Sequence, residues 1–300
     1  SVQGGAFTNT DCAYNAANQL TSDITGGAQT DYSYDDNGNL VQKQIGADLT
    51  TYGFDSLDRM TSATVNGVTS SYSYDVAGKR IRKNLTQSGQ GITEYWHQGD
   101  NIIAEADPVS QTISATYNTP FLDENVSMNR NGQTYYYMQD GLGSVRQVLN
   151  PLTQESMNSY DYNAWGEAVS RLELVQNPYR YTGREWDNEA NQYYYRARYY
   201  NQQVGRFSSI DPKGMSSVDN LYAYVSNNPL NFIDPYGFDD VQVFHRTTED
   251  AAIKILGEGF KDDYSWFTTD ETFAKTTGAG GPYFADKDVG AVRLFVDGNL

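Results

Sequence analysis

Four segments with one common plan decide the fold of this chain: Tyr14-Asn-Ala-Ala-Asn-Gln-Leu20, Tyr34-Asp-Asp-Asn-Gly-Asn-Leu40, Phe54-Asp-Ser-Leu-Asp-Arg-Met60 and Tyr74-Asp-Val-Ala-Gly-Lys-Arg80. Their leading aromatic residues lie 20 positions apart, and each is followed by Asp or Asn and a short polar turn. The flanks alternate, as in Thr30-Asp-Tyr-Ser-Tyr34, which predicts one β-hairpin per repeat. Because a single hairpin cannot bury its aromatic face alone, neighbouring hairpins are expected to stack.

The composition supports a β-rich domain. The 300 residues include 25 Tyr, 12 Phe and 4 Trp, and aromatic residues favour strands. The net charge of −17 argues against bulk binding to nucleic acid or to anionic membranes. A single cysteine excludes an internal disulfide framework, and no apolar run is long enough to span a membrane. With only His97 and His245 as histidines and no HExxH motif, no metal is expected.

Beyond residue 85 the regular spacing stops, but segments rich in the same aromatic and turn residues continue. The segments that follow one another are Gln192-Tyr-Tyr-Tyr-Arg-Ala-Arg-Tyr-Tyr200, Gly205-Arg-Phe-Ser-Ser-Ile-Asp-Pro212, Asn220-Leu-Tyr-Ala-Tyr-Val-Ser-Asn-Asn-Pro229 and Phe232-Ile-Asp-Pro-Tyr-Gly237. This order resembles the C-terminal end of Rhs/YD-repeat proteins, in which a repeat-associated core closes before a variable tip.

The resemblance covers residues 1–238 and implies the domain organisation. YD repeats would occupy 1–85, the Rhs core 86–238, and a small α+β toxin segment 239–300. The implied fold is mainly β: a hollow, spiralling β-hairpin shell, or cocoon, that encloses the toxin. The first residues lack a Met and the last predicted strand, 291–296, ends in a turn, so we expect a piece of a longer protein.

The same family cleaves its own chain just after an Asp-Pro-x-Gly motif, which here is Asp234-Pro-Tyr-Gly237. The resemblance therefore implies a cut near Phe238–Asp239, with Asp211 and Asp234 as catalytic carboxylates and Arg206 as the essential arginine. Two carboxyl groups that share a proton can supply both the base and the acid that hydrolysis needs. The alternative is structural, because Asp-Pro readily starts a turn and Arg206 could simply pair with Asp211.

After Phe238 the tyrosine-rich pattern ends. The sequence predicts strands over 240–245 and 266–268, a helix over 251–257 with an N-cap in Thr247–Asp250, and a short helix over 269–275. This order is similar to the N-terminal half of ADP-ribosyltransferase toxins.

That similarity implies NAD as cofactor, without a metal. His245 and Arg246 would hold its ribose and phosphates, and Trp266, Phe267 and Thr268 would form the motif that stacks on nicotinamide. No third-motif Glu is present, and only 62 residues (300 − 238) follow the junction, so we expect a truncated and inactive transferase. His245 as an ordinary strand-end residue, and Trp266 and Phe267 as core aromatics, remain open alternatives.

Two other functions remain open. A nuclease tip is disfavoured because residues 239–300 hold 12 acidic and 6 basic side chains, a net charge of −6. A non-enzymatic YD-repeat shell is the second. The resemblance further implies a secreted or delivered bacterial effector, an immunity protein that binds the tip, and secretion-machinery or toxin-complex proteins as partners.

Overall fold

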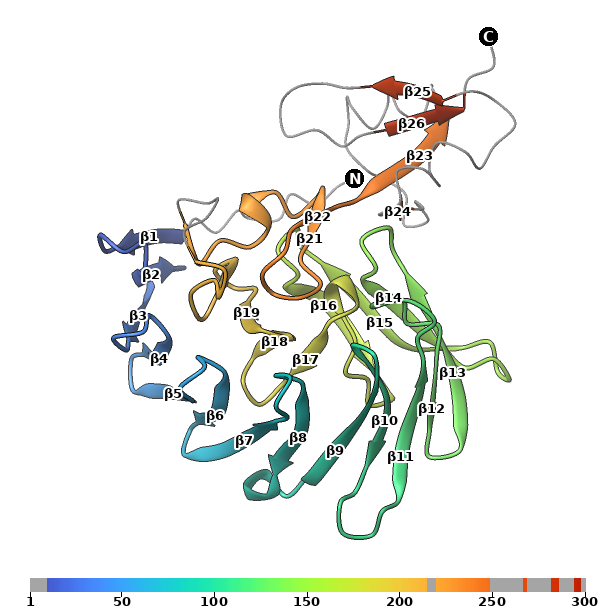
Figure 1. Ribbon diagram of the computed structural model, residues 1–300, viewed down its shortest axis with the longest axis horizontal. Coiled ribbons are helices and arrows are strands. Elements are labelled where there is room, and N and C mark those ends of the chain that lie inside the picture. Colours follow the sequence, from blue (N-terminus) through green and yellow to red (C-terminus); the bar gives the residue numbers. More distant parts are fainter. Residues whose placement is uncertain (1–9, 215–219, 249–266, 269–281, 286–293, 298–300) are drawn as a thin grey trace.

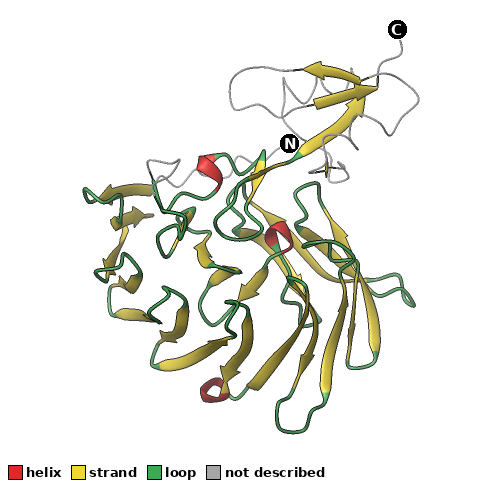
Figure 2. Ribbon diagram, in the orientation of Figure 1, coloured by secondary structure: helices red, strands yellow, loops and turns green. Residues whose placement is uncertain are grey.

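The computed structural model describes residues 10–214, 220–248, 267–268, 282–285 and 294–297. The two helices expected over 251–257 and 269–275 lie outside these residues, as does Trp266. In the described part of the chain the helices are three 3-10 turns, coloured red in Figure 2: η1 (Thr86–Ser88), η2 (Tyr181–Gly183) and η3 (Val225–Asn227). None of the described helices has the length and apolar character that a membrane crossing requires.

One antiparallel sheet of sixteen strands dominates the molecule, with its strands in strict chain order (Figure 1). Every strand pairs with its sequence neighbour, so the sheet is a continuous series of hairpins. It runs across residue 85 without interruption. Its strands are β1 (Thr10–Tyr14), β2 (Leu20–Thr25), β3 (Ala28–Tyr34), β4 (Leu40–Ile45), β5 (Asp48–Phe54), β6 (Met60–Val65), β7 (Val68–Tyr74), β8 (Arg80–Leu85), β9 (Gly91–Gln98), β10 (Asn101–Ala106), β11 (Ile113–Asn118), β12 (Ser127–Arg130), β13 (Gln133–Gln139), β14 (Val145–Leu149), β15 (Ser156–Tyr162) and β16 (Ala168–Glu173).

Three smaller sheets follow in the chain. The first has the order β17-β18-β19-β20, the second pairs β21 with β22, and the third has the order β24-β23-β26-β25. Their strands are β17 (Glu185–Asp187), β18 (Gln192–Tyr195), β19 (Arg198–Asn201), β20 (Arg206–Phe207), β21 (Phe232–Ile233), β22 (Val241–Gln242), β23 (Phe244–Thr248), β24 (Phe267–Thr268), β25 (Pro282–Ala285) and β26 (Leu294–Asp297).

The Asp after each leading aromatic residue explains the repeat. Asp75 Oδ1 accepts the backbone N–H groups of Ala77 and Lys79, both at 2.9 Å, and so closes the turn between β7 and β8. Asp35 and Asp55 close the preceding turns in the same way. A side-chain oxygen that satisfies the turn's own amides fixes the hairpin locally.

Buried tyrosines on one face of the sheet make the core. Tyr32, Tyr52 and Tyr72 lie at equivalent repeat positions, each at most 8% exposed, and they share a cluster with Tyr194 and Tyr199 of the following small sheet. The long sheet curves around β17–β19, which lie within the curve in Figure 1. The aromatic face of the hairpins is therefore buried against residues of the same chain, as the hydrophobic effect requires.

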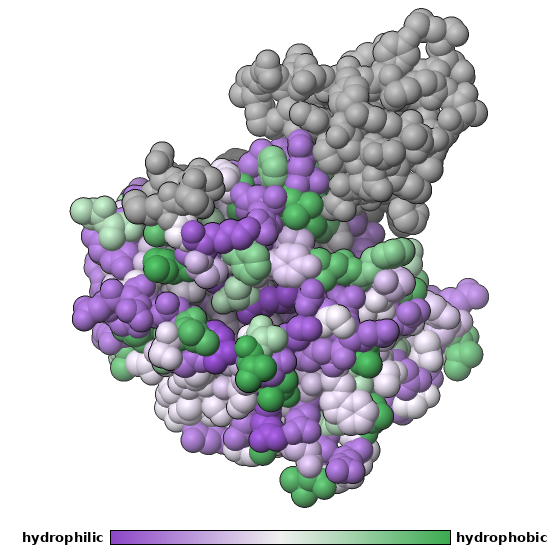
Figure 3. All heavy atoms as spheres, viewed as in Figure 1, coloured by the Kyte–Doolittle hydropathy of each residue, from purple (hydrophilic) through white to green (hydrophobic). Residues whose placement is uncertain are grey.

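Some large apolar side chains of the described residues are exposed on the outer surface. The most exposed among them include Leu57, Val76, Val109 and Leu152, all in hairpin turns. In the space-filling view of Figure 3, hydrophobic residues are scattered among hydrophilic ones. Exposed apolar residues scattered in this way are normal on protein surfaces.

The predicted fold class, mainly β with a spiralling series of hairpins, is confirmed. One detail of the expectation was incomplete. In the described residues the inside of the curve is not empty, because Tyr179, Tyr194 and Tyr199 pack against the tyrosine face. The reason is physical: rings that line a water-filled interior would gain no burial energy.

Removing the turn carboxylate should destabilise the repeat. We expect Asp75→Ala to lower the free energy of unfolding by about 1–3 kcal/mol, because two turn amides lose their acceptor. Asp75→Asn should cost clearly less, since Asn163 Oδ1 holds the equivalent turn near β15. Urea unfolding of both variants measures this difference. Equal losses would contradict the assigned role of the side-chain oxygen.

Candidate active site

The site is built around a turn that follows β21, here called the junction loop (residues 234–240). Asp234 Oδ1 accepts three successive backbone N–H groups, from Gly237 at 2.8 Å, Phe238 at 3.0 Å and Asp239 at 2.9 Å. The last of these nitrogens belongs to the predicted Phe238–Asp239 peptide bond. A carboxyl oxygen of Asp234 thus lies within hydrogen-bond distance of the atom that becomes the amine when that bond breaks.

Gly237 fixes the loop on the turn between β18 and β19. The backbone of Gly237 has φ of +77°, and a Cβ at this position would lie 2.3 Å from the Tyr195 carbonyl oxygen. The Tyr236 carbonyl accepts the Ala197 N–H at 3.1 Å, and the Arg196 guanidinium donates to the Pro235 carbonyl. Only glycine combines this conformation with so close an approach.

Arg198 joins the two predicted carboxylates. Its Nη2 lies 3.0 Å from Asp211 Oδ2 and 3.6 Å from Asp234 Oδ2, so one guanidinium bridges both side chains. Its Nε donates to the Gly237 carbonyl, and its Nη1 to the Leu221 carbonyl at 3.0 Å. The face of its guanidinium covers the Phe207 ring at 3.6 Å. Arg198 therefore fixes the distance between the carboxylates and the junction loop.

Burial sets the protonation of this cluster. The Asp234 side chain is 1% exposed, and burial raises its pKa above the ordinary value, although the backbone donors and Arg198 oppose the shift. Its Oδ2 accepts no hydrogen bond from the described residues. Burial also lowers the pKa of Arg198 and raises the pKa of Asp240, whose Oδ2 accepts the Ser226 hydroxyl at 3.1 Å. The site thus holds a carboxyl group that is easier to protonate than an ordinary aspartate.

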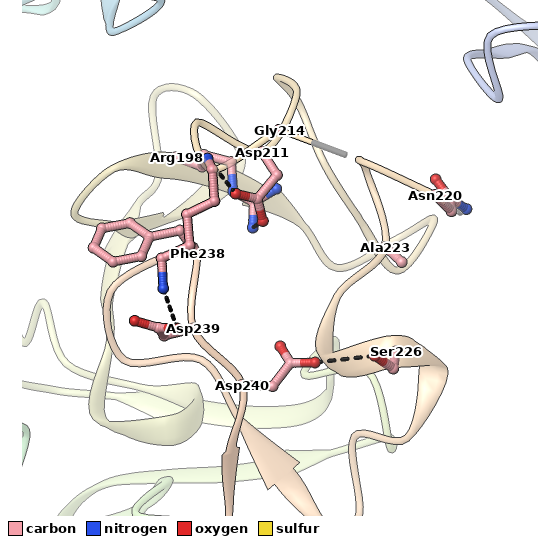
Figure 4. A pocket seen from close by; sticks show the side chains of 10 residues that line it. Arg198, Asp211, Gly214, Asn220, Ala223, Ser226, Phe238, Asp239 and Asp240 are labelled. Carbon is pink, nitrogen blue, oxygen red and sulfur yellow. Dashed lines mark hydrogen bonds and ion pairs between the residues drawn. The ribbon is translucent and has the colours of Figure 1, made fainter. Parts of the chain in front are cut away.

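A cavity of about 380 Å³ opens beside the junction loop (Figure 4). In Figure 4 the Arg198–Asp211 pair and the Ser226–Asp240 pair lie around one space, with Phe238 and Asp239 also lining it. Lys213 pairs with the Asp239 carboxylate and lies 4.9 Å from the Phe238 ring centre. Both residues of the predicted scissile bond are therefore accessible from the cavity that Asp211 lines.

The structure brings Asp211 and Asp234 together and places Arg206 elsewhere. The Arg206 guanidinium donates to the Asn18 carbonyl and to Asn220 Oδ1, and it lies over the Tyr14 and Tyr222 rings. These contacts tie β20 to the first hairpin turn, and no ion pair between Arg206 and Asp211 is present in the described residues. The arginine that contacts both carboxylates is Arg198, which was not predicted from the sequence.

The predicted NAD-binding residues can be placed only by backbone register. Strand β23 pairs antiparallel with β24, so that His245 lies opposite Phe267 and Phe244 opposite Thr268. On its other edge β23 pairs in parallel with β26, with Arg246 opposite Phe295. The two strands that would carry the first and second motifs are neighbours, and the binding roles of their residues stay predictions.

Gly237→Ala should strain the junction loop far more than a glycine substitution in open space. The matched control is Gly214→Ala, because Gly214 also has positive φ, at +69°, but a Cβ added there would have nothing within 4 Å. We expect the control to lose about 1 kcal/mol of stability and Gly237→Ala at least twice that. Thermal unfolding compares the two variants, and equal melting temperatures would contradict the close packing of the loop.

Several known proteins are similar to part of this chain. No protein-family model matches it. The tRNA3(Ser)-specific nuclease WapA of Bacillus spizizenii is 31% identical over 249 residues, which cover 79% of this chain and 10% of WapA. Toxin subunit YenC2 of Yersinia entomophaga is 35% identical over 105 residues, 35% of this chain and 11% of YenC2.

A solved TcdB2–TccC3 crystal structure aligns with 76% of this chain and 18% of its own, at 17% identity and a TM-score of 0.34. The chain spans about a tenth of the length of the WapA and YenC2 proteins that it matches. The repeats, the order of the core segments and the identities to WapA and YenC2 together lead to one conclusion. The chain shares the YD/Rhs-repeat shell region found in WapA and YenC2.

Proposed function

We propose that this chain is the closing part of a toxin shell and hydrolyses its own Phe238–Asp239 bond. The observation that carries the proposal is the position of Asp234, whose Oδ1 lies 2.9 Å from the Asp239 nitrogen while Arg198 links Asp234 to Asp211. A purely structural turn needs the Asp234 acceptor, but it does not need a second carboxylate and a buried arginine bridging the two.

In the proposed reaction, Asp211 takes a proton from a water that attacks the Phe238 carbonyl carbon from the cavity. The C–N bond breaks, and protonated Asp234 gives its proton to the departing Asp239 nitrogen. The raised pKa of Asp234, caused by its burial, favours the protonated form that this step requires. Arg198 holds the two carboxyl groups in place and, through Gly237, orients the bond.

The variants Asp234→Asn, Asp211→Asn and Arg198→Lys test the proposal. We expect wild-type protein to yield two pieces that divide after Phe238, and each variant to slow their formation by about 10²–10⁴-fold. Arg198→Lys keeps the charge but cannot make the same set of directed contacts. Intact mass spectrometry over time after purification gives the rate.

The control is Asp107→Asn, an aspartate in the β10–β11 turn, which should be cut at the wild-type rate. A wild-type chain that stays intact would refute self-cleavage and leave the structural shell as the remaining interpretation. A cut that persists in Asp234→Asn would refute the assigned acid.

For residues 239–300 we propose an NAD-binding, ADP-ribosyltransferase-like toxin. The specific support is the pairing of β23 with β24, which sets the strand of His245 and Arg246 beside that of Phe267 and Thr268. His245 and Arg246 would hold the ribose and phosphates, and Trp266 with the β24 residues would contact nicotinamide. When bound, NAD would supply an ADP-ribosyl group with nicotinamide as leaving group.

The name tRNA nuclease belongs to the WapA proteins, of which this chain spans about a tenth. We do not propose nuclease activity for this tip, because its net charge of −6, from 12 acidic and 6 basic residues, repels a phosphate backbone. The same proposal includes delivery of the toxin into target cells. It also includes toxin-complex proteins and an immunity protein as partners.

The NAD proposal is tested by binding. Titration calorimetry of the chain with NAD should show binding that His245→Ala weakens at least tenfold, because the first-motif contact is lost. His97→Ala is the matched control, since His97 lies on β9 of the shell and is the only other histidine. Absence of NAD binding, or equal weakening by both substitutions, would contradict the proposal.

A further inference from the structure

We propose that the cut site becomes a binding site for its own product: Asp234 binds the new α-ammonium group of Asp239, and β22 keeps the downstream piece attached to the shell. This inference rests on the proposed self-cleavage. It assigns the junction a second task, which is to control when the released piece leaves.

The first support is that several contacts downstream of the bond do not depend on the bond. Strand β22 pairs with β21 through Val241 opposite Ile233 and Gln242 opposite Phe232. The next residue, Val243, donates its N–H to the Asn231 carbonyl at 2.9 Å, and its side chain is 3% exposed. All of these contacts join residues after Asp239 to residues before Phe238. Hydrolysis therefore leaves a strand pairing in place across the new chain ends.

The second support is the charge that hydrolysis creates. A neutral amide nitrogen becomes an α-amine, which is cationic below its ordinary pKa of about 7.7–8.0. That nitrogen lies 2.9 Å from Asp234 Oδ1, in a side chain that is 1% exposed and whose Oδ2 accepts no hydrogen bond from the described residues. A buried carboxylate with spare acceptor capacity gains strongly from a cation at this distance.

The surrounding charges also favour a new cation. The groups that face this position are the carboxylates of Asp211, Asp234 and Asp240, the Arg198 guanidinium, and the Lys213–Asp239 pair. Once Asp234 has given up its proton in the proposed reaction, three carboxylates face one guanidinium, because Lys213 is already paired with Asp239. An α-ammonium would reduce this negative excess where the uncut amide cannot.

The third support is a hydrogen bond between Ser226 and Asp240, both of which line the cavity; this hydrogen bond is here called the clasp. Ser226 Oγ donates to Asp240 Oδ2 at 3.1 Å, which ties a residue of the released piece to the shell (Figure 4). Ser226 lies in a left-handed turn with φ of +51°, next to Val225 at +42°. For a β-branched residue such as valine this conformation is unfavourable, so the surrounding packing must hold it. The clasp is therefore presented by a segment with a fixed geometry.

The experiment follows the two pieces after cleavage of the full chain carrying a C-terminal affinity tag. The complex is bound through the tag, washed without denaturant, and the release of the upstream piece is timed at pH 7.0 and at pH 9.5. We expect both pieces to remain together at pH 7.0 and release to be at least fivefold faster at pH 9.5, where the α-ammonium loses its proton. Ser226→Ala should speed release at both pH values.

Ser110→Ala, in the β10–β11 turn, is the control and should release at the wild-type rate. An uncut chain would end both proposals together. A cut chain whose pieces separate at once would overturn this inference and leave self-cleavage standing. Release that is slow but independent of pH, or unaffected by Ser226→Ala, would equally overturn the assigned role of the α-ammonium group or of the clasp.

Discussion

The burial of one tyrosine-lined face is the constraint on which the rest of this structure depends. A run of hairpins offers a long aromatic surface, and the small sheet β17–β20 supplies the surface that covers it. A buried ion-pair network fixes how the two fit: Arg80 of β8 pairs with Glu185 and Asp187 of β17, and its guanidinium lies 4.1 Å from the Tyr194 ring centre. Buried charges are tolerated only with such partners, so the network favours one alignment.

The candidate active site is a consequence of that alignment. Strands β18 and β19 of the inner sheet cover the tyrosine face and are joined by a short turn. The junction loop packs against this turn through Gly237. Arg198 begins β19 and so lies at the same place, between Asp211 and Asp234. Core packing and the geometry of the candidate site therefore share one strand. A change that loosens the inner sheet would move the carboxylates as well as weaken the fold.

The sequence predicted correctly those features that depend on contacts between residues close together in the chain. The turn Asp bonds to amides two and four residues on, so its spacing predicts each hairpin. Asp211 and Asp234 came from a family motif, and the fold brings them together through a third residue. Arg198 was not predicted because it lies two residues from Arg196 in the same tyrosine-rich run. In the sequence the two arginines look equivalent, and only the fold gives them different surroundings. Arg196 has φ of +57° in the turn, whereas Arg198 is buried. The burial of Arg198, which makes it need carboxylate partners, is visible only in the fold.

In the proposed reaction Asp234 must first donate a proton and then bind the amine that forms, and a change in its protonation allows both. To release the Asp239 nitrogen the carboxyl group must begin protonated, which its burial favours. Once that proton has moved and the C–N bond has broken, Asp234 is a carboxylate and the nitrogen is a neutral amine, at a distance that began as 2.9 Å. The new Phe238 carboxylic acid then gives up a proton, and the amine takes up a proton and becomes a cation below its ordinary pKa of about 7.7–8.0. Hydrolysis followed by this proton uptake thus creates the ion pair that replaces the covalent link. Because β22 stays paired to β21, the two charges remain close enough to attract each other.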